Sequence, residues 1–244
     1  MLSERELERY DRQMMIKGFG AEGQQKLKSA RVIIAGSGGL GSPISIYLAV
    51  AGVGSITVVD YDTVALSNLN RQINFWNKDI DRKKVDSASE KLSAINPDIV
   101  INPVSDKIDE SNAGEIIGDN DLIVDAMDNI PTRLLLNRVA IEKNIPIFHG
   151  AVYGFDGRVT TIIPGQTPCL RCLYPRIPPP SKFPVVGVAP AVIGCIQAAE
   201  VIKYITGLGE LLAGRILMYD GLKSKFVHLD VKRRSGCDAC SHIK

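Results

Sequence analysis

The sequence predicts an α/β protein with a doubly wound, mostly parallel sheet and a smaller antiparallel extension toward its C-terminal end. Three observations support this prediction. Short apolar segments alternate with helical segments up to about residue 150, and such alternation is typical of a parallel sheet. A glycine-rich turn directly follows the first apolar segment. Beyond residue 150 the pattern changes to β-branched segments and a proline-rich stretch.

The composition is that of an ordinary soluble globular protein. Of the 244 residues, 45% are hydrophobic and 23% are charged. The net charge of +2 indicates neither a nucleic-acid-binding nor a membrane-binding surface. The first residues, MLSERELERYDRQ, are charged, and no uninterrupted apolar run reaches membrane-spanning length. We therefore expect a cytoplasmic protein without a nucleic-acid or membrane partner.

The first segments predict a helical N-terminal region followed by a βαβ unit. Residues 3–28 read as helical, and Ser3 with Glu6 fits a capping box at the start. The βαβ unit that follows comprises a strand at 31–36, a helix at 43–51 and a strand at 55–60.

The remaining segments continue the alternation and then leave it. We expect a helix at 83–95, strands at 99–103 and 121–126, a helix at 131–143 and a strand at 145–149. After these come an antiparallel strand at 158–163, irregular or extended chain at 174–190, a buried helix at 191–206 and a closing hairpin at 215–219 and 225–232.

The glycine-rich turn is predicted to hold phosphates. Its G-x-G-x-x-G spacing falls on Gly36, Gly38 and Gly41, with Gly39 between them. Glycine permits positive φ and lets backbone N–H groups approach an anion closely. A helix beginning near Ser42 would direct its positive dipole end toward the same anion. Taken alone, the turn indicates only a generic, Rossmann-like dinucleotide site.

Two carboxylates follow the second strand of the βαβ unit. Asp60 stands ~20 residues past the glycines, where a ribose-binding carboxylate is expected. The alternative is that Asp60, with Asp62, simply forms a surface turn at the end of a strand. Because the glycine turn is in register with it, ribose binding is the favoured interpretation.

The next loop places amide side chains around an arginine. The guanidinium of Arg71, just beyond a ribose, would reach the phosphates of a nucleotide. A solvated loop has the same composition, and Lys84 is equally interpretable as an exposed helix charge, so both readings stay open. The other polar residues of this loop are Ser67, Asn68, Asn70 and Gln72.

Carboxylates also end the strand predicted at 121–126. Parallel sheets bind ligands at this edge, and a carboxylate beside a nucleotide suits Mg²⁺, which prefers oxygen ligands. Asp125 has two interpretations, as a magnesium ligand or as a structural residue. We therefore favour the more C-terminal Asp128 as the magnesium ligand, with Asn129 beside it.

Four of the five cysteines form two C-x-x-C pairs, Cys169 with Cys172 and Cys237 with Cys240. Four thiolates are the ligand set of a closed structural zinc site, which has no open position for catalysis. A redox dithiol is the alternative for either pair alone. Zinc would fix the C-terminal tail to the extension. The fifth cysteine, Cys195, is expected to be a buried small hydrophobic side chain.

In this order and combination, the motifs resemble the E1-like adenylating family. That family includes the molybdopterin-synthase and thiamine sulfur-carrier adenylyltransferases and the adenylation domains of ubiquitin-activating enzymes. The resemblance spans nearly the whole chain. It rests on Arg9–Gln13, Gly36–Ser42, Asp60–Asp62, Ser67–Gln72, Lys84-Val85, Asp125–Asn129 and both cysteine pairs.

The resemblance implies one adenylation domain over residues 1–244, normally a homodimer. It would contain N-terminal helices (1–30), a nucleotide-binding core (31–150) and a carrier-binding antiparallel region (151–244) with the zinc site and a crossover loop at 174–190. It also implies that ATP and Mg²⁺ serve to adenylate the C-terminal glycine carboxylate of a small ubiquitin-like sulfur-carrier protein ending in Gly-Gly, with release of pyrophosphate.

The resemblance further implies a role for each site residue. Arg71 and Lys84 would bind phosphate, Asp128 would hold Mg²⁺, Asp60 would bind the ribose, and Arg12 would reach into the partner subunit's site. The nucleotide site would be completed by the four glycines together with Asp62, Ser67, Asn68, Asn70, Gln72 and Asn129.

One departure from the family pattern concerns cysteine. Family members that continue to a covalent step usually carry a cysteine in the crossover loop, and residues 174–190 contain none. We therefore expect adenylation without a thioester or persulfide on this protein. No sulfurtransferase segment follows the zinc motif, so a separate sulfur donor is expected.

Three other functions remain as alternatives. An NAD-dependent oxidoreductase is the generic interpretation of the glycine turn, but no hydride-transfer residue is evident. A non-catalytic subunit of an activating enzyme would not need Arg12, Arg71, Lys84 and Asp128. A tRNA-modifying member of the same family is disfavoured by the zinc motif and by the near-neutral charge.

Overall fold

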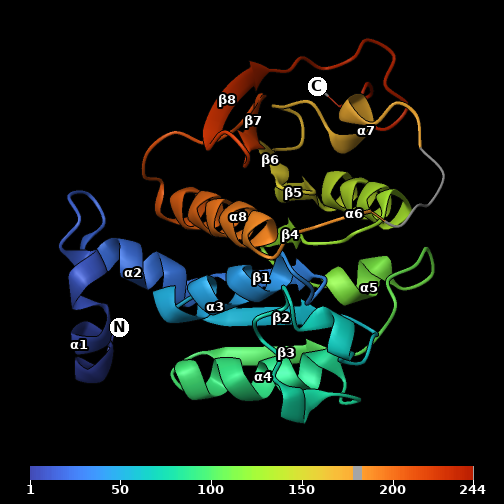
Figure 1. Cartoon of the computed structure of the whole chain (residues 1–244). Helices are drawn as coiled ribbons and strands as arrows, with labels where there is room; N and C mark the ends of the chain where they lie inside the picture. The colour runs from blue at the N-terminus through green and yellow to red at the C-terminus, as the bar shows by residue number, and fades with distance from the viewer. Residues whose placement is uncertain (178–182, 244) are drawn as a thin grey trace.

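The computed structural model describes residues 1–177 and 183–243. Its centre is one eight-stranded sheet in the order β3-β2-β1-β4-β5-β6-β7-β8, with helices on both faces (Figure 1). The strands are β1 Arg31–Ala35, β2 Ser55–Val59, β3 Val100–Val104, β4 Leu122–Asp125, β5 Ile147–Tyr153, β6 Asp156–Ile162, β7 Arg215–Asp220 and β8 Lys225–Asp230.

The sheet changes from parallel to antiparallel at β5. Strands β3, β2, β1, β4 and β5 run parallel, whereas β6, β7 and β8 alternate in direction. The predicted fold class is therefore confirmed. The antiparallel extension continues the same sheet, because β5 is long enough to pair with β4 through its first residues and with β6 along its whole length.

Helices cover the two faces unequally. The α-helices are α1 Glu4–Met14, α2 Gly20–Ser29, α3 Gly41–Ala51, α4 Lys84–Ile95, α5 Ala113–Ile117, α6 Ile130–Lys143, α7 Leu170–Leu173 and α8 Val188–Thr206. Alternate residues of β1 supply two separate cores: Val32 and Ile34 face α2, α3, α4 and α8, while Ile33 and Ala35 face α5, α6 and α7. This two-sided burial explains why β1 is apolar throughout.

The N-terminal stretch is helical, as predicted, and consists of α1 and α2. The capping box is present, because Ser3 N donates to Glu6 Oε2 at 2.8 Å and Glu6 N donates to Ser3 Oγ at 3.2 Å. The helical character predicted for 3–28 is confirmed, and the structure divides this stretch into two helices. Helix α1 ends at Met14, and Gly18, in the connection between α1 and α2, has a φ of +85°. Glycine adopts such left-handed backbone without strain.

Two short helices and one helix start differ from the prediction. Helices α5 and α7 were not predicted, because they are too short to show helical periodicity. Helix α8 begins at Val188, three residues before the expected start, because Pro190 is tolerated in a first helical turn. The prolines at 178–180 lie outside the described residues.

Helix α8 is long and apolar enough to cross a membrane by length and composition alone. In this fold it packs instead between α3 and the strands β5 and β6 (Figure 1). Its buried Glu200 accepts hydrogen bonds from Thr161 Oγ1 at 2.6 Å and from Leu212 N at 2.7 Å. These contacts make α8 a core helix of the described structure.

Candidate active site

The glycine turn leaves β1 at the point where the strand order reverses. Strand β1 pairs with β2 on one side and with β4 on the other, and ligands bind at such switch points in doubly wound sheets. Gly36 has a φ of +101°, and a Cβ there would lie 2.7 Å from the carbonyl oxygen of Ala126. Any other residue would be strained at this position. The turn then leads directly into α3 at Gly41.

Asp60 is held against this turn by backbone donors. Its Oδ2 accepts from Ser37 N at 2.9 Å, and its Oδ1 accepts from Asp62 N at 3.0 Å. Burial raises the pKa of the Asp60 carboxyl above its ordinary value, although the charge of Lys84 and the two backbone N–H groups oppose this rise. The structure thus brings the predicted ribose ligand beside the predicted phosphate turn.

Lys84 is a buried residue rather than an exposed helix charge. It begins α4, and only 5% of its surface is exposed. Its Nζ donates to Asp62 Oδ2 at 2.9 Å and lies 3.8 Å from Asp60 Oδ2. A buried ammonium group paired with two carboxylates places a positive charge beside the turn, and this contact excludes the solvated alternative for Lys84.

Arg71 also lies against the glycine turn. A Cβ on Gly39 would meet the Arg71 side chain at 3.4 Å. The guanidinium is held in place because its Nη1 donates to Ser67 O at 3.0 Å and to Asn70 Oδ1 at 2.8 Å. Lys84 and Arg71 therefore both border the glycine turn, from α4 and from the preceding loop respectively.

Two buried polar atoms beside the turn lack a hydrogen-bond partner within the described residues. They are Ser37 Oγ and Gln72 Oε1, on side chains that are 1% and 4% exposed. Gln72 Nε2 lies 3.6 Å from the position of a Cβ on Gly38. Buried groups without partners are rare in folded proteins, and at a switch point they suit a polar ligand. Ser37 was not predicted as a site residue, although its position between Gly36 and Gly38 is a signal that could have identified it.

The remaining polar residues of the site have local roles. Asn68 Oδ1 accepts from Ala65 N at 3.0 Å, and Asn129 Oδ1 caps α6 by accepting from Thr132 N at 2.9 Å. Asp128 is exposed immediately before this cap. The assignment of these three side chains to nucleotide or Mg²⁺ remains a prediction.

The Asp125 side chain is buried and bonded to other groups of the protein, which does not favour a role as metal ligand. Its Oδ2 lies 2.6 Å from His149 Nδ1 and 3.7 Å from Arg133 Nε, and its Oδ1 accepts from Met127 N at 3.1 Å. The side chain is fully buried. This network supports the structural interpretation of Asp125. His149 was not predicted as a site residue, since its only signal in the sequence is its position at the end of a buried strand.

Arg12 lies far from the glycine turn of its own chain. Helix α1 packs against the C-terminal ends of α3 and α4, where Asn96 Nδ2 donates to Tyr10 OH at 2.8 Å and Gln13 Nε2 donates to Ala51 O at 2.9 Å. Both α3 and α4 begin at the site, so α1 lies at their far ends (Figure 1). Arg12 is exposed there and cannot reach the site within one subunit.

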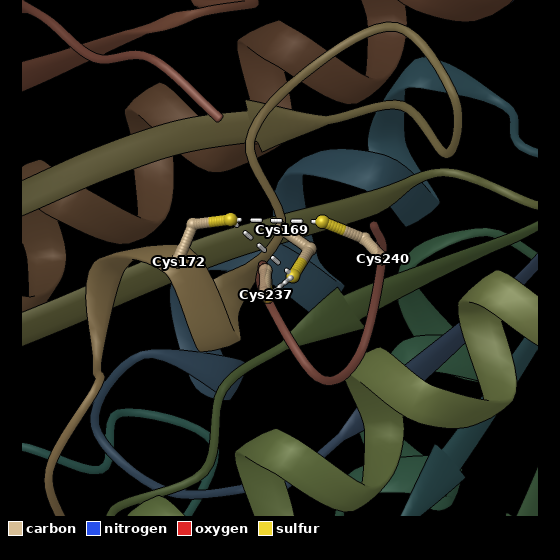
Figure 2. A group of neighbouring side chains, drawn as sticks. All are labelled: Cys169, Cys172, Cys237 and Cys240. Atoms are coloured by element: carbon tan, nitrogen blue, oxygen red, sulfur yellow. Dashed lines mark hydrogen bonds between the residues drawn. The ribbon is translucent and has the colours of Figure 1, made fainter. Parts of the chain in front are cut away.

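The two cysteine pairs meet in space beside α6 (Figure 2). The sulfur of Cys169 lies 4.0 Å from that of Cys172 and 3.8 Å from that of Cys237, and Cys172 and Cys240 are 3.6 Å apart. Tetrahedral zinc with Zn–S bonds of ~2.3 Å requires sulfurs ~3.8 Å apart. The four residues therefore fit a structural zinc ion.

The surroundings of the cluster affect its thiols differently, since burial raises the pKa of Cys169 and of Cys240, whereas the pKa of Cys237 is lowered. Burial raises the pKa of Cys237, but the backbone N–H groups of Ala239 and Cys240 outweigh it and lower that pKa to about 7. Arg234 N donates to Cys172 Sγ at 3.4 Å. Cys195 is elsewhere, on α8. It is only partly buried, which corrects the expectation of a fully buried side chain.

The relationship to known proteins follows from comparison of the sequence. A model of the ThiF family matches residues 10–239. The chain belongs to the ThiF family. This match spans the glycine turn, the Arg71 loop and both cysteine pairs, and it confirms the resemblance to the E1-like adenylating proteins.

Two relatives are similar to this chain over most of their own length. The chain is 42% identical to the SAMP-activating enzyme E1 of Haloferax volcanii over 96% of this chain and 89% of that protein. It is 43% identical to the sulfur carrier protein adenylyltransferase of Thermus thermophilus, over 96% and 91% respectively. The fold is also that of Escherichia coli MccB bound to MccA-N7isoASN, with a TM-score of 0.87 at 23% identity over 99% of this chain and 76% of that one.

Proposed function

We propose that this protein uses ATP to adenylate the C-terminal carboxylate of a small ubiquitin-like sulfur-carrier protein and releases pyrophosphate. The observation that carries the proposal is the pair of cations beside the glycine turn, Arg71 from one loop and buried Lys84 from α4. The names of the ThiF relatives, an E1 enzyme and a sulfur carrier protein adenylyltransferase, support the same reaction.

The chemistry requires positive charge more than it requires a base. A carboxylate oxygen of the carrier attacks the α-phosphorus, the bond from that phosphorus to the bridging oxygen breaks, and pyrophosphate leaves with the electron pair. The triphosphate repels the incoming carboxylate, so cations at the phosphates lower the barrier. The attacking carboxylate is already ionised at neutral pH, so no general base is needed.

Each residue of the site has a proposed role in this step. Asp60, fixed by the N–H groups of Ser37 and Asp62, accepts from the ribose hydroxyls. Lys84 and Arg71 bind phosphate oxygens, and backbone N–H groups of the glycine turn add to them. Exposed Asp128 holds Mg²⁺, which needs only one or two protein carboxylates when phosphates supply other ligands.

A homodimer would complete the site. Arg12 lies too far from the turn of its own chain, at the C-terminal ends of α3 and α4. We assign it to the site of the partner subunit, where it adds a third cation near the phosphates. The dimer is then required for activity and not only for stability.

The carrier's tail would pass beneath the crossover segment 174–190. The described parts of this segment begin beside α7, at Tyr174, and return to the Arg71 loop. There a Cβ on Gly187 would lie 2.5 Å from Asn70 O. Val185 forms a parallel bridge with Gly154 just before that point. The segment thus connects the cysteine cluster with a residue proposed to bind phosphate.

The cysteine distribution separates adenylation from sulfur transfer. Four cysteines form the proposed zinc site, Cys195 lies on α8, and the segment 174–190 contains no cysteine. The acyl-adenylate would therefore pass to a separate sulfur donor without a thioester on this protein. A reducible covalent adduct between carrier and enzyme would contradict this part of the proposal.

The decisive experiment is ATP–pyrophosphate exchange with a panel of small ubiquitin-like proteins that end in Gly-Gly. Exchange should depend on the carrier, and Arg71→Ala should lower its rate by roughly 100-fold to 1,000-fold. Arg138→Gln, which changes an exposed arginine on α6, is the matched control. An NAD-dependent or tRNA-modifying enzyme would give no carrier-dependent exchange, and that result would overturn the proposal.

A further inference from the structure

A line of side chains runs from the nucleotide edge of the sheet to one guanidinium in the antiparallel extension. Asp125 Oδ2 contacts His149 Nδ1 at 2.6 Å, and His149 Nε2 lies 3.0 Å from Tyr174 OH. The Arg158 guanidinium lies over the Tyr174 ring, 5.1 Å from its centroid. Asp125, at one end of this line, is three residues from the proposed magnesium ligand.

The first members of the line are buried and fixed. Asp125 and His149 are 0% and 1% exposed. Burial lowers the pKa of His149 below its ordinary value, and the charges of Arg133 and Arg158 lower it further, while Asp125 opposes them. A neutral imidazole that donates a hydrogen bond from Nδ1 to Asp125 accepts a hydrogen bond from the Tyr174 hydroxyl at Nε2. Tyr174 is thereby held in one orientation.

Arg158 is the end of the line that faces outward. It is half-buried on β6 opposite Ala151, and this pair lies beyond the last residue of β4. Across residues 1–177 and 183–243, no carboxylate forms an ion pair with it. Stacking on a tyrosine that is itself anchored leaves the five N–H donors of the guanidinium in a fixed plane. Such a preorganised, unpaired cation is suited to bind an anion.

The position of Arg158 indicates which anion. Tyr174 is the first residue of the crossover segment, and the far end of that segment pairs with Gly154, in the turn between β5 and β6. Arg158 therefore lies where the segment begins to cross toward Arg71. A protein tail that passed between these two described ends of the segment would meet this guanidinium.

We propose that Arg158 binds a carboxylate of the protein substrate's C-terminal tail, with Tyr174 and His149 as its positioning residues. The inference rests on the proposed function, because that function supplies a protein substrate with a terminal carboxylate. The carboxylate is either the terminal one, held before it attacks the α-phosphate, or an acidic side chain of the tail. In both cases Arg158 selects the protein substrate and not the nucleotide.

Calorimetric titration without ATP tests the proposal. The probe is the Gly-Gly carrier that supports pyrophosphate exchange by the wild type. Arg158→Gln should weaken carrier binding by roughly 10-fold to 100-fold, the value of a hydrogen-bonded charge. The carrier affinity of Arg158→Lys should lie between those of the wild type and Arg158→Gln, because lysine keeps the charge but lacks the planar guanidinium. The KM for ATP should stay unchanged in both variants, and Arg138→Gln should bind the carrier as the wild type does.

Two further arms identify the carboxylate and test the positioning residues. A carrier made with a terminal amide should bind Arg158→Gln and wild type equally if Arg158 reads the terminal carboxylate, whereas the difference should persist if it reads an acidic side chain. Tyr174→Phe keeps the stacked ring but loses the bond to His149, and should raise the carrier's KM by roughly threefold at unchanged KM for ATP.

The outcomes separate this inference from the proposed function. If wild-type enzyme exchanges pyrophosphate but Arg158→Gln binds the carrier as tightly as wild type, the inference is wrong and the proposed function stands. If no carrier supports exchange or binds the wild type, both are wrong.

Discussion

The glycine turn and the cysteine cluster differ in what their side chains face. At the turn, Asp60, Lys84 and Arg71 come from separate elements and border an open edge, where Ser37 Oγ and Gln72 Oε1 have no partner within the described residues. In the cluster, four sulfurs face one another and leave no open direction (Figure 2).

This difference separates chemistry from structure. An edge with unpaired polar atoms and adjacent cations suits a ligand that arrives and departs, whereas a closed tetrahedral set suits an ion that stays. Changes of the site side chains that are not buried, such as Arg71 and Asp128, should therefore lower activity at constant stability, whereas changes in the cluster should lower stability.

The first prediction concerns cations from two subunits in one site. Arg12→Ala and Arg71→Ala should each lower pyrophosphate exchange by roughly 100-fold to 1,000-fold, because each removes a charge at the phosphates. Equal amounts of the two variants, mixed so that subunits exchange, should regain about a quarter of the wild-type rate. About half of the dimers are then mixed, and one of the two sites in each mixed dimer keeps both arginines. Exchange assays on the mixtures measure this recovery. An unrestored mixture would contradict the assignment of Arg12 to the site of the partner subunit.

The second prediction concerns metal removal from the cysteine cluster. If free zinc exceeds the dissociation constant 100-fold to 1,000-fold, the ion contributes about 2.7–4.1 kcal/mol, and a chelator should lower Tm by roughly 5–15 °C. Calorimetry with and without chelator measures this shift, and readdition of zinc should reverse it. Cys237→Ser should reproduce it, whereas Cys195→Ser, outside the cluster, should respond to chelator as the wild type does. A Tm independent of chelator would contradict the zinc assignment.

The third prediction concerns the exposed carboxylate after β4. Asp128→Ala should raise the Mg²⁺ concentration needed for half-maximal exchange by about tenfold, because the phosphates keep the remaining ligands. Its Tm should stay at the wild-type value, since the side chain is exposed. Asp119→Ala, an exposed carboxylate just before β4, provides the control. If the Mg²⁺ titration of Asp128→Ala matches the wild type, another group holds the ion.

The fourth and smallest prediction concerns His149. The unfolded chain binds a proton near the ordinary pKa of 6.5, whereas burial lowers the pKa in the folded protein. Stability due to this group is therefore fully present above pH 6.5 and is lost as pH falls below it. Between about pH 7.5 and pH 5.5 the wild type should lose up to ~1.4 kcal/mol of unfolding free energy more than His149→Gln does.

Urea unfolding at the two pH values measures the effect of His149. His228→Gln, which removes an exposed histidine on β8, should keep the pH dependence of the wild type. Equal pH slopes in wild type and His149→Gln would show that His149 does not stay neutral in the fold.

Local patterns in the sequence determined most of the helices and strands and the order in which the site residues follow one another along the chain. Strand β1, the glycine turn and Asp60 follow one another along the chain, so their meeting at the edge of a parallel sheet could be inferred. The capping box at Ser3 and the two C-x-x-C pairs are likewise short-range patterns with one strongly preferred use. The helices α5 and α7 escaped prediction because they are too short to show a period.

Only the tertiary structure decided which charges are buried and which distant residues meet. The sequence left Lys84 equally interpretable as an exposed helix charge, and the packing of α4 buries it beside Asp60 and Asp62. His149, Tyr174 and Arg158 form no sequence motif, and they meet because β5 continues past β4 into the antiparallel strands. Burial and long-range pairing depend on the whole sheet, which no local stretch of residues encodes.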